Sequence, residues 1–176
     1  MDIKNLRTPL DIKDIDFRIQ SINKGGYATI LAYKNARVDM NRLDDVCGAE
    51  NWQRDHKELK NVIYAGIGIY FKDSEQWVWK WDAGSESFTE KQKGESSDSF
   101  KRSGFNWGIG RELYDYPVIQ VKLNADEFEL KDNKARATWN LKLKQWRWHS
   151  EFKDGKLVRL AAKDENSKLR FNFKTE

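Results

Sequence analysis

The sequence predicts an α+β fold: an antiparallel β-meander packed under one long helix, a β-β-β-α core, with an additional C-terminal β-hairpin. Every second residue over 62–71 is apolar, which is the period of a strand with one buried face. Aromatic and apolar side chains recur at helical spacing over 95–117. An Asp-Gly pair at 154–155, which favours a type I′ turn, separates two apolar runs and predicts the hairpin.

The first elements are predicted from capping and turn residues. Thr8, Pro9 and Asp11 have the order of a hydroxyl cap, a first-turn proline and a first-turn carboxylate, so a short helix is expected over 8–20. The β-prone run at 27–34 predicts the first strand.

A second helix is expected after Asn35, whose side chain can cap a first turn. Apolar residues then recur at helical spacing up to Cys47, and Gly48 suits the position after the last turn. Cys47 is therefore expected in the core.

Three strands are expected to form the meander, at 52–60, 62–71 and 76–84. The third strand places three tryptophans on one side, and the prediction is that they form core beneath the long helix: Trp77, Trp79 and Trp81.

The long helix is expected to begin at Ser96 or Ser97, which can accept from the first N–H groups, and to stop before Pro117. Three glycines within it are expected to allow close packing on a sheet: Gly104, Gly108 and Gly110. The polar stretch 84–94 before it is expected to be a mobile loop.

Composition excludes several classes of protein. The chain has 176 residues, 34% of them charged, and 8 tryptophans, so it is long enough for a real core and too aromatic for a disordered chain. A single cysteine excludes an internal disulfide, and two distant histidines leave no zinc-ligand cluster. No apolar run is long enough to span a membrane. We expect a cytoplasmic protein without cofactors.

Positive charge is concentrated towards the C-terminus. Residues 1–117 carry 18 Lys or Arg against 19 Asp or Glu, whereas residues 118–176 carry 14 against 9. A polyanion would be attracted first to the second segment.

Two basic sequences are candidate DNA contacts. Lys101 and Arg102 project about 100° apart on a helix and could flank a groove that follows a phosphate backbone, although such a pair is also typical of a solvated helix face. The segment 139–149, if extended, puts Leu141 and Leu143 on one side. The other side would then carry Lys142, Lys144, Trp146 and Trp148.

Lysines between exposed rings suit sequence-tolerant binding of single strands, because lysines contact phosphates and rings stack on bases. The alternative is that both tryptophans are core or subunit contacts.

Enzymatic motifs are weak. No phosphate-binding loop of the G-x-x-x-x-G-K-[ST] type occurs, so ATP hydrolysis is not expected. Glu129 and Lys131, with Asp126 or Asp115 upstream, have the spacing of some magnesium-dependent nucleases, but such a tripeptide is common by chance.

Four blocks of sequence resemble the Rad52-type single-strand DNA annealing proteins, particularly the short bacteriophage forms. In chain order they are LRTPLDIKDIDFRI, ILAYKNARVDMNRLDDVCGAENW, WDAG and SDSFKRSGFNWGIGRELYDYP. The resemblance implies a DNA-annealing core over 1–117, with 118–176 as a β-rich extension of the same domain. It also implies assembly into a ring and a DNA-binding groove to which Lys101, Arg102 and Arg37 contribute.

The resulting hypothesis is a protein, not an enzyme, that anneals complementary DNA strands without ATP or metal in recombination and repair. Expected partners are single-stranded DNA, further copies of the chain and, as a candidate, a single-strand-binding protein of a bacterial host. The alternatives are a magnesium-dependent nuclease and a non-catalytic oligomeric scaffold. The hypothesis requires that Lys101 and Arg102 are not locked in internal ion pairs.

Overall fold

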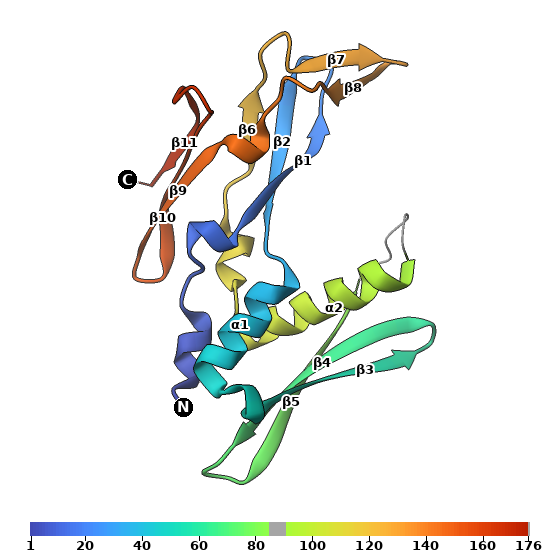
Figure 1. Cartoon of the computed structure of the whole chain (residues 1–176), viewed down its shortest axis with the longest axis vertical. Helices are drawn as coiled ribbons and strands as arrows, with labels where there is room; N and C mark the ends of the chain where they lie inside the picture. The colour runs from blue at the N-terminus through green and yellow to red at the C-terminus, as the bar shows by residue number, and fades with distance from the viewer. Residues whose placement is uncertain (85–90, 176) are drawn as a thin grey trace. The chain divides into compact units, whose positions relative to one another are not determined.

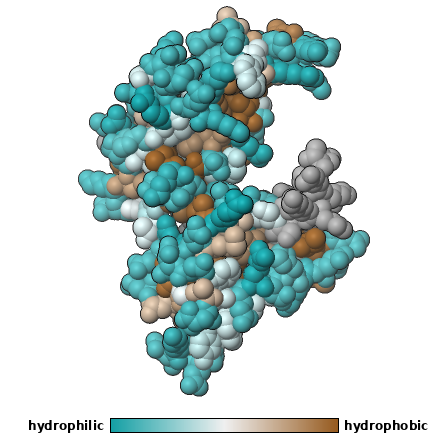
Figure 2. Space-filling model, viewed as in Figure 1, coloured by the Kyte–Doolittle hydropathy of each residue, from teal (hydrophilic) through white to brown (hydrophobic). Residues whose placement is uncertain are grey.

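The computed structural model describes the backbone of residues 1–84 and 91–175 and, within these ranges, all side chains except those of residues 91–96. Over this part of the chain the structure is mixed α and β, with mostly antiparallel sheets and two α-helices (Figure 1). The face seen in Figure 2 is mainly hydrophilic, in keeping with a mean hydropathy of -0.87.

The chain divides into two compact units, each built from two separate segments of sequence. Unit 1 comprises Met1–Leu10 and Lys34–Arg111, and unit 2 comprises Asp11–Tyr33 and Glu112–Glu176. Residues on both sides of position 117 therefore contribute to unit 2.

Unit 1 contains an antiparallel sheet covered on one face by a helix. Its strands, in the order β3-β4-β5, are Trp52–Leu59, Val62–Phe71 and Gln76–Ala83. The helix, α2, spans Lys91–Trp107. Three apolar side chains of β4 that face α2 are fully buried: Ala65, Ile67 and Ile69.

Two polar side chains of α2 fix the helix on this sheet. The Trp107 indole N–H donates to the carbonyl oxygen of Ile67 at 2.9 Å. The Ser103 hydroxyl oxygen lies 2.9 Å from the Ala65 carbonyl oxygen and 2.7 Å from that of Lys80. The turn of α2 that follows Lys101 therefore has a defined position over β4 and β5.

The long helix differs from the prediction at both ends. It begins at Lys91, so Ser96 and Ser97 lie within the helix and are not its caps. It ends ten residues before Pro117, because Gly108 and Gly110 adopt φ angles of +103° and +71°, which no helix interior accepts. The loop expected at 84–94 is wrong at its end, since residues 91–94 belong to α2, and residues 85–90 lie outside the described residues.

The prediction that the tryptophans lie beneath the helix is wrong. Trp79 and Trp81 pair across the ladder with Gly68 and Gly66, so they occupy the face of the sheet opposite to α2. There they form a ladder with Trp77, with ring centroids 6.4 and 5.5 Å apart. A Cβ atom at Gly68 would come within 2.5 Å of the Trp79 ring, so the glycines make room for the indoles.

Helix α1, Ala36–Cys47, agrees with the prediction. The Asn35 side chain accepts from the Arg37 N–H at 2.9 Å, Gly48 takes a φ of +85°, and Cys47 is buried. Two short 3₁₀ turns of unit 1 lie before and after α1 in the chain: η1 at Ile3–Arg7 and η3 at Ala49–Asn51. A third, η4 at Arg111–Asp115, follows α2, and its residues after Arg111 belong to unit 2.

The helix predicted over 8–20 is wrong. Its residues form the 3₁₀ turn η2, Ile12–Asp14, and the strand β1, Asp16–Ile22. Apolar residues in β1 alternate with polar ones, and β1 pairs antiparallel with β2, Tyr27–Tyr33. Pairing with β2 therefore outweighs the local helix-start signal.

Unit 2 contains the remaining strands. β6, Ile119–Lys122, completes a sheet of order β1-β2-β6. A second sheet has the order β11-β10-β9, and a two-stranded sheet joins β7 and β8. Their bounds are Phe128–Lys131 for β7, Lys134–Ala137 for β8, Arg147–Lys153 for β9, Lys156–Lys163 for β10 and Leu169–Lys174 for β11, with the 3₁₀ turn η5 at Leu143–Gln145.

The predicted C-terminal hairpin is confirmed, since β9 and β10 are joined by Asp154 and Gly155 with φ angles of 51° and 75°. Its inner face joins the core of unit 2. That core includes Ile30, Ile119 and Leu160, which come from β2, β6 and β10.

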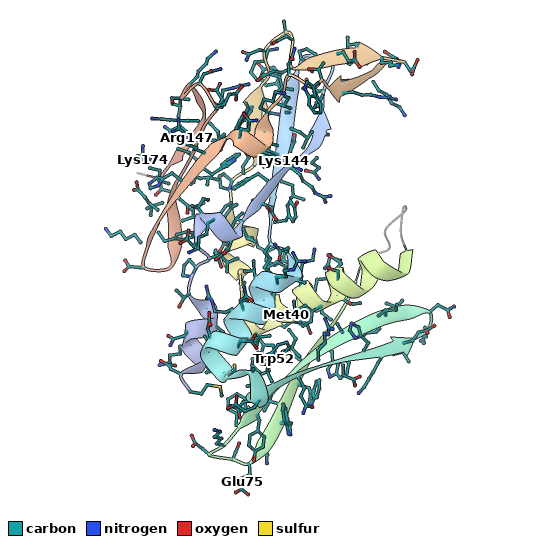
Figure 3. All side chains as sticks on the ribbon, in the orientation of Figure 1. Met40, Trp52, Glu75, Lys144, Arg147 and Lys174 are labelled. Atoms are coloured by element: carbon teal, nitrogen blue, oxygen red, sulfur yellow. The ribbon has the colours of Figure 1, made fainter. Side chains whose placement is uncertain are left out.

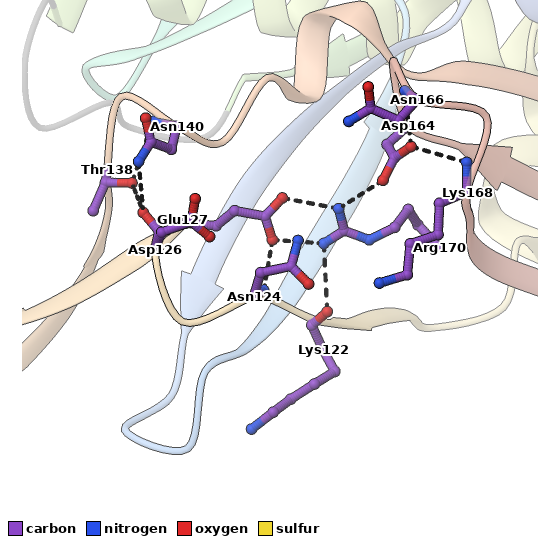
Figure 4. A network of polar contacts seen from close by, with 10 residues as sticks. All are labelled: Lys122, Asn124, Asp126, Glu127, Thr138, Asn140, Asp164, Asn166, Lys168 and Arg170. Atoms are coloured by element: carbon purple, nitrogen blue, oxygen red, sulfur yellow. Dashed lines mark hydrogen bonds and ion pairs between the residues drawn. The ribbon is translucent and has the colours of Figure 1, made fainter.

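A buried ion-pair network links β11 to the loop after β6 (Figure 4). The Arg170 guanidinium donates to both carboxylate oxygens of Glu127, at 2.8 and 2.7 Å, and to Asp164 at 3.2 Å. Burial disfavours the Glu127 carboxylate, but the hydrogen bonds from Arg170 and from the Asn124 N–H hold its pKa below the ordinary value. The same guanidinium lies 4.5 Å from the ring of Trp146.

Candidate nucleic-acid interface

Lys101 and Arg102 lie on α2, directly after Phe100, which is buried. Their side chains are partly exposed, at 24% and 41%. Both approach the same carboxylate, because Asp98 is three and four residues earlier on the helix: the nitrogen–oxygen distances are 3.9 Å for Lys101 and 3.0 Å for Arg102.

The DNA-binding hypothesis requires that Lys101 and Arg102 are not locked in internal ion pairs, and the contacts with Asp98 test this requirement. The Asp98 side chain is itself 31% exposed, so both contacts lie at the surface. Exposed pairs at this helical spacing contribute only about 0.3–0.5 kcal/mol, which a phosphate group can match. Asp98 therefore reduces the charge offered by this turn without burying it.

Arg37 is exposed in the first turn of α1, where Asn35 caps the helix. This turn packs closely on α2, because a Cβ atom at Gly104 would lie only 2.0 Å from a carboxylate oxygen of Asp39. Gly104 is one turn after Lys101. The absence of a side chain at Gly104 thus allows α2 to pack on α1, whereas packing on a sheet was expected.

A buried ion pair underlies this contact between the helices. Lys34 and Asp39 are 1% and 0% exposed, and the Lys34 ammonium donates to the Asp39 carboxylate and to the Ile109 carbonyl oxygen. The ammonium also lies 4.1 Å from the centre of the Phe105 ring. One lysine therefore connects the start of α1 with the residues that end α2.

Burial raises the pKa of Asp39 to about 6, against the opposing effect of Lys34 and, more weakly, of Lys101. The pull from Lys101 is consistent with its turn of α2 lying near the first turn of α1. Sequence patterns missed this pair because a lysine at the end of a strand and an aspartate on a helix are usually solvated.

The segment 139–149 does not form the single extended strand on which its predicted two-sided arrangement depended. Residues 143–145 form η5, and only the residues from Arg147 onwards belong to β9. Lys144, labelled in Figure 3, is exposed and Lys142 is half-buried. The two lysines and the two tryptophans therefore do not share one strand face.

The two tryptophans of this segment have different environments. Trp146 is 6% exposed, in the core of unit 2, and its ring lies against Arg170, so it offers no free face for a base. Trp148 is half-buried and stacks on Phe17, with centroids 3.7 Å apart and planes 2° from parallel. Trp146 fits the alternative interpretation of a core residue.

The acidic residues considered for a nuclease are separate surface groups in the described structure. Glu129 is exposed on β7, opposite Arg136, and Asp126 and Asp115 are exposed in their own segments. Among the described side chains, no group of three or more His, Cys, Asp or Glu is placed to hold a metal ion.

In the described ranges, no helix combines the length and apolarity needed to cross a membrane.

A comparison with protein families matches residues 3–132 to the model of the Rad52/22 family double-strand break repair proteins. The chain belongs to this family. The matched range includes Arg37, Lys101 and Arg102, both α-helices and the β3-β4-β5 sheet. Searches of curated proteins and of solved structures find no match.

Membership of the Rad52/22 family implies a role in DNA repair and recombination, with DNA binding and oligomerisation as general properties. The match ends between β7 and β8, so η5, Lys142 and Lys144 lie outside it.

Proposed function

We propose that this chain binds single-stranded DNA and anneals complementary strands without ATP and without a catalytic step. The proposal is supported by one observation above all: the family match contains a partly exposed cation pair on α2, and the neighbouring first turn of α1 carries Arg37. Lys101, Arg102 and Arg37 are the proposed phosphate contacts.

The physical basis is charge neutralisation. Cations that hold phosphates lower the repulsion between two approaching strands and leave the base edges free for pairing. Because phosphates carry no sequence information, annealing of this kind is independent of sequence.

The proposal includes assembly into a homo-oligomeric ring, in which neighbouring copies continue the phosphate-binding groove. The face of the β3-β4-β5 sheet that carries Trp77 is a candidate subunit contact, since this ring is 38% exposed. A single-strand-binding protein of the host is a proposed partner.

The experiment is an annealing assay with two complementary labelled oligonucleotides, in chelator and without nucleotide. The native chain should accelerate pairing, and the double variant Lys101→Glu with Arg102→Glu should abolish it. A matched control reverses two exposed lysines in the sheet turns of the same unit, Lys60→Glu with Lys72→Glu, and should keep most of the activity.

Other outcomes identify the alternatives. Degradation of DNA that requires magnesium and stops with chelator would indicate a nuclease. Normal assembly with no binding of a labelled oligonucleotide at low salt would indicate a scaffold. If the control and the double variant lose annealing equally, the positions proposed for phosphate contact are wrong.

A further inference from the structure

Unit 2 has a groove beside η5, of which the family match includes the β1 side but neither η5 nor Trp139. It consists of two adjoining hollows, of about 530 and 450 Å³, which share Phe17, Leu143 and Lys144 as lining residues. Together they are called the η5 groove. Each hollow is within the size range of pockets that hold small organic groups such as a nucleobase.

The groove carries excess positive charge. Arg18, Lys142 and Lys144 line the smaller hollow, and none of its lining residues, all of which are described, is acidic. The larger hollow adds Lys13 and a single carboxylate, Asp16. This charge is complementary to a phosphate chain.

The groove also presents an exposed aromatic ring. Trp139 is 87% exposed, and the Lys142 ammonium lies 4.6 Å from its ring centre. Hydrogen bonds hold the loop on both sides of this ring: the Thr138 hydroxyl and the Asn140 amide both donate to the Asp126 carbonyl oxygen (Figure 4). Stacking a flat partner on a large apolar ring is favourable, because it buries the ring surface, and an anchored loop holds the ring in place for that contact.

Further rings line the inner part of the groove. Phe17 and Trp148 form a parallel stack there, and the Arg18 guanidinium lies 5.4 Å from the Tyr33 ring. β1, the edge strand of its sheet, lies against η5 and β8. The groove thus offers rings and cations to a ligand, a combination that suits bases and phosphates better than an added peptide strand.

We infer that the η5 groove is a second binding site for single-stranded nucleic acid, separate from the cations of unit 1. One base stacks on Trp139 while Lys142, Lys144 and Arg18 contact the adjacent phosphates. This inference rests on the proposed function and adds to it a site where Trp139, Lys142 and Lys144, all beyond residue 132, adjoin Arg18 of β1.

The first test is photocrosslinking of the full chain to an oligothymidine that carries one 5-iodouracil, a base that crosslinks to stacked aromatic rings. Mass spectrometry of the peptides should place a crosslink at Trp139. Trp139→Phe should retain the crosslink, and Trp139→Ala should lose it while the circular dichroism spectrum stays unchanged. Crosslinks at other residues with none at Trp139 would overturn the inference.

The second test is a salt titration of oligothymidine binding. The slope of log K against log salt is negative, and each phosphate contact on a single strand contributes about 0.7 to its magnitude. Removing two contacts therefore reduces that magnitude by about 1.4. Lys142→Gln with Lys144→Gln should show this decrease. The control, Lys153→Gln with Lys156→Gln in the β9–β10 turn, changes the same charge outside the groove and should not.

An unchanged slope in the groove variant would contradict nucleic-acid binding there. The same conclusion follows if the groove variant keeps oligothymidine binding but loses binding of a polyglutamate peptide, because the groove would then be a protein site.

The two sites can fail independently. With Lys101→Glu and Arg102→Glu, annealing should be lost while the Trp139 crosslink persists. If those reversals leave annealing intact and the groove variants remove it, the unit 1 assignment fails and the groove stands. If the reversals in unit 1 abolish annealing, but the groove variants change neither the crosslink nor the salt dependence of binding, the proposed function stands and the groove inference fails.

Discussion

At the scale of single residues, Asp98 is the side chain that sets how much charge the proposed DNA contacts offer. It contacts Lys101 and Arg102 at once, so the three residues together carry one net positive charge rather than two. A carboxylate in this place weakens binding of a polyanion and restrains both cations in the free protein.

We therefore expect Asp98→Asn to strengthen binding of single-stranded DNA by about threefold to tenfold at low salt, with a smaller gain at high salt because ions screen the added charge. Fluorescence anisotropy with a labelled oligonucleotide measures the effect. Asp73→Asn, an equal charge change in the exposed β4–β5 turn, should have less effect. Weaker binding by Asp98→Asn would mean that the carboxylate positions the cations.

The buried Asp39 gives a prediction about pH. Its pKa is about 6 in the folded protein and near its ordinary 3.8 when unfolded, because burial disfavours the carboxylate. Between these values the folded state holds more protons, so the stability from this group is present at low pH and is lost as the pH rises through about 4 to 6.

We expect the melting temperature of the native protein, relative to that of Asp39→Asn, to rise when the pH falls from 7 to 5. The corresponding change in the free energy of unfolding is on the order of 1 kcal/mol. Thermal melts of both proteins at the two pH values measure it. A shift in favour of the variant would show that the attraction of Lys34 outweighs burial.

At the scale of elements, the packing of α1 on α2 depends on Gly104. An added methyl group would overlap the Asp39 carboxylate, which Lys34 holds in place, so the two helices would have to separate. Gly104→Ala should therefore destabilise the protein by about 1–3 kcal/mol, despite the better helix propensity of alanine. Denaturant unfolding measures this loss.

Ser97→Ala, on an exposed position of the same helix, is the control and should stay within about 0.5 kcal/mol of the native protein. Combining Gly104→Ala with Asp39→Ala should cost less than the sum of the two single changes if the overlap is the cause. Strict additivity would place the strain elsewhere.

The elements also indicate how far sequence reasoning reached. α1, the C-terminal hairpin and the periodicity of β4 followed from local signals, since caps, Asp-Gly turns and alternation act over a few residues. The helix expected over 8–20 failed because pairing between β1 and β2 is a tertiary effect.

The candidate site was predictable only in part. The positions of Lys101, Arg102 and Arg37 came from motifs. The spacing of Asp98 from Lys101 and Arg102 would have predicted their ion pairs on the expected helix, because residues three and four apart are neighbours on a helix surface. Trp139 began the basic-aromatic segment that was singled out, but its exposed position beside Lys142 could not be predicted, because the 3₁₀ turn η5 interrupts that segment.

At the scale of the whole molecule, the two units have separate cores, so a local change should loosen one unit more than the other. Arg170→Met leaves Glu127 and Asp164 without their shared cation and should destabilise unit 2 by about 3 kcal/mol or more. Hydrogen exchange should rise in β6 and β11 and change little in β3, β4 and β5.

Lys174→Met, an exposed cation on the same strand, is the control and should leave exchange in both units unchanged. Equal acceleration across both units for Arg170→Met would show that they open as one cooperative body.

Each unit consists of two segments that alternate along the chain, so the order of synthesis on the ribosome determines which unit is complete first. Unit 1 has all its residues once Arg111 has been added, although the β1–β2 hairpin lies between its two segments. That hairpin finds its apolar partners only later, when Ile119 and then Leu160 leave the exit tunnel. A chain that ends near residue 117 and has left the ribosome would thus contain all of unit 1 together with a hairpin whose apolar side chains lack their partners.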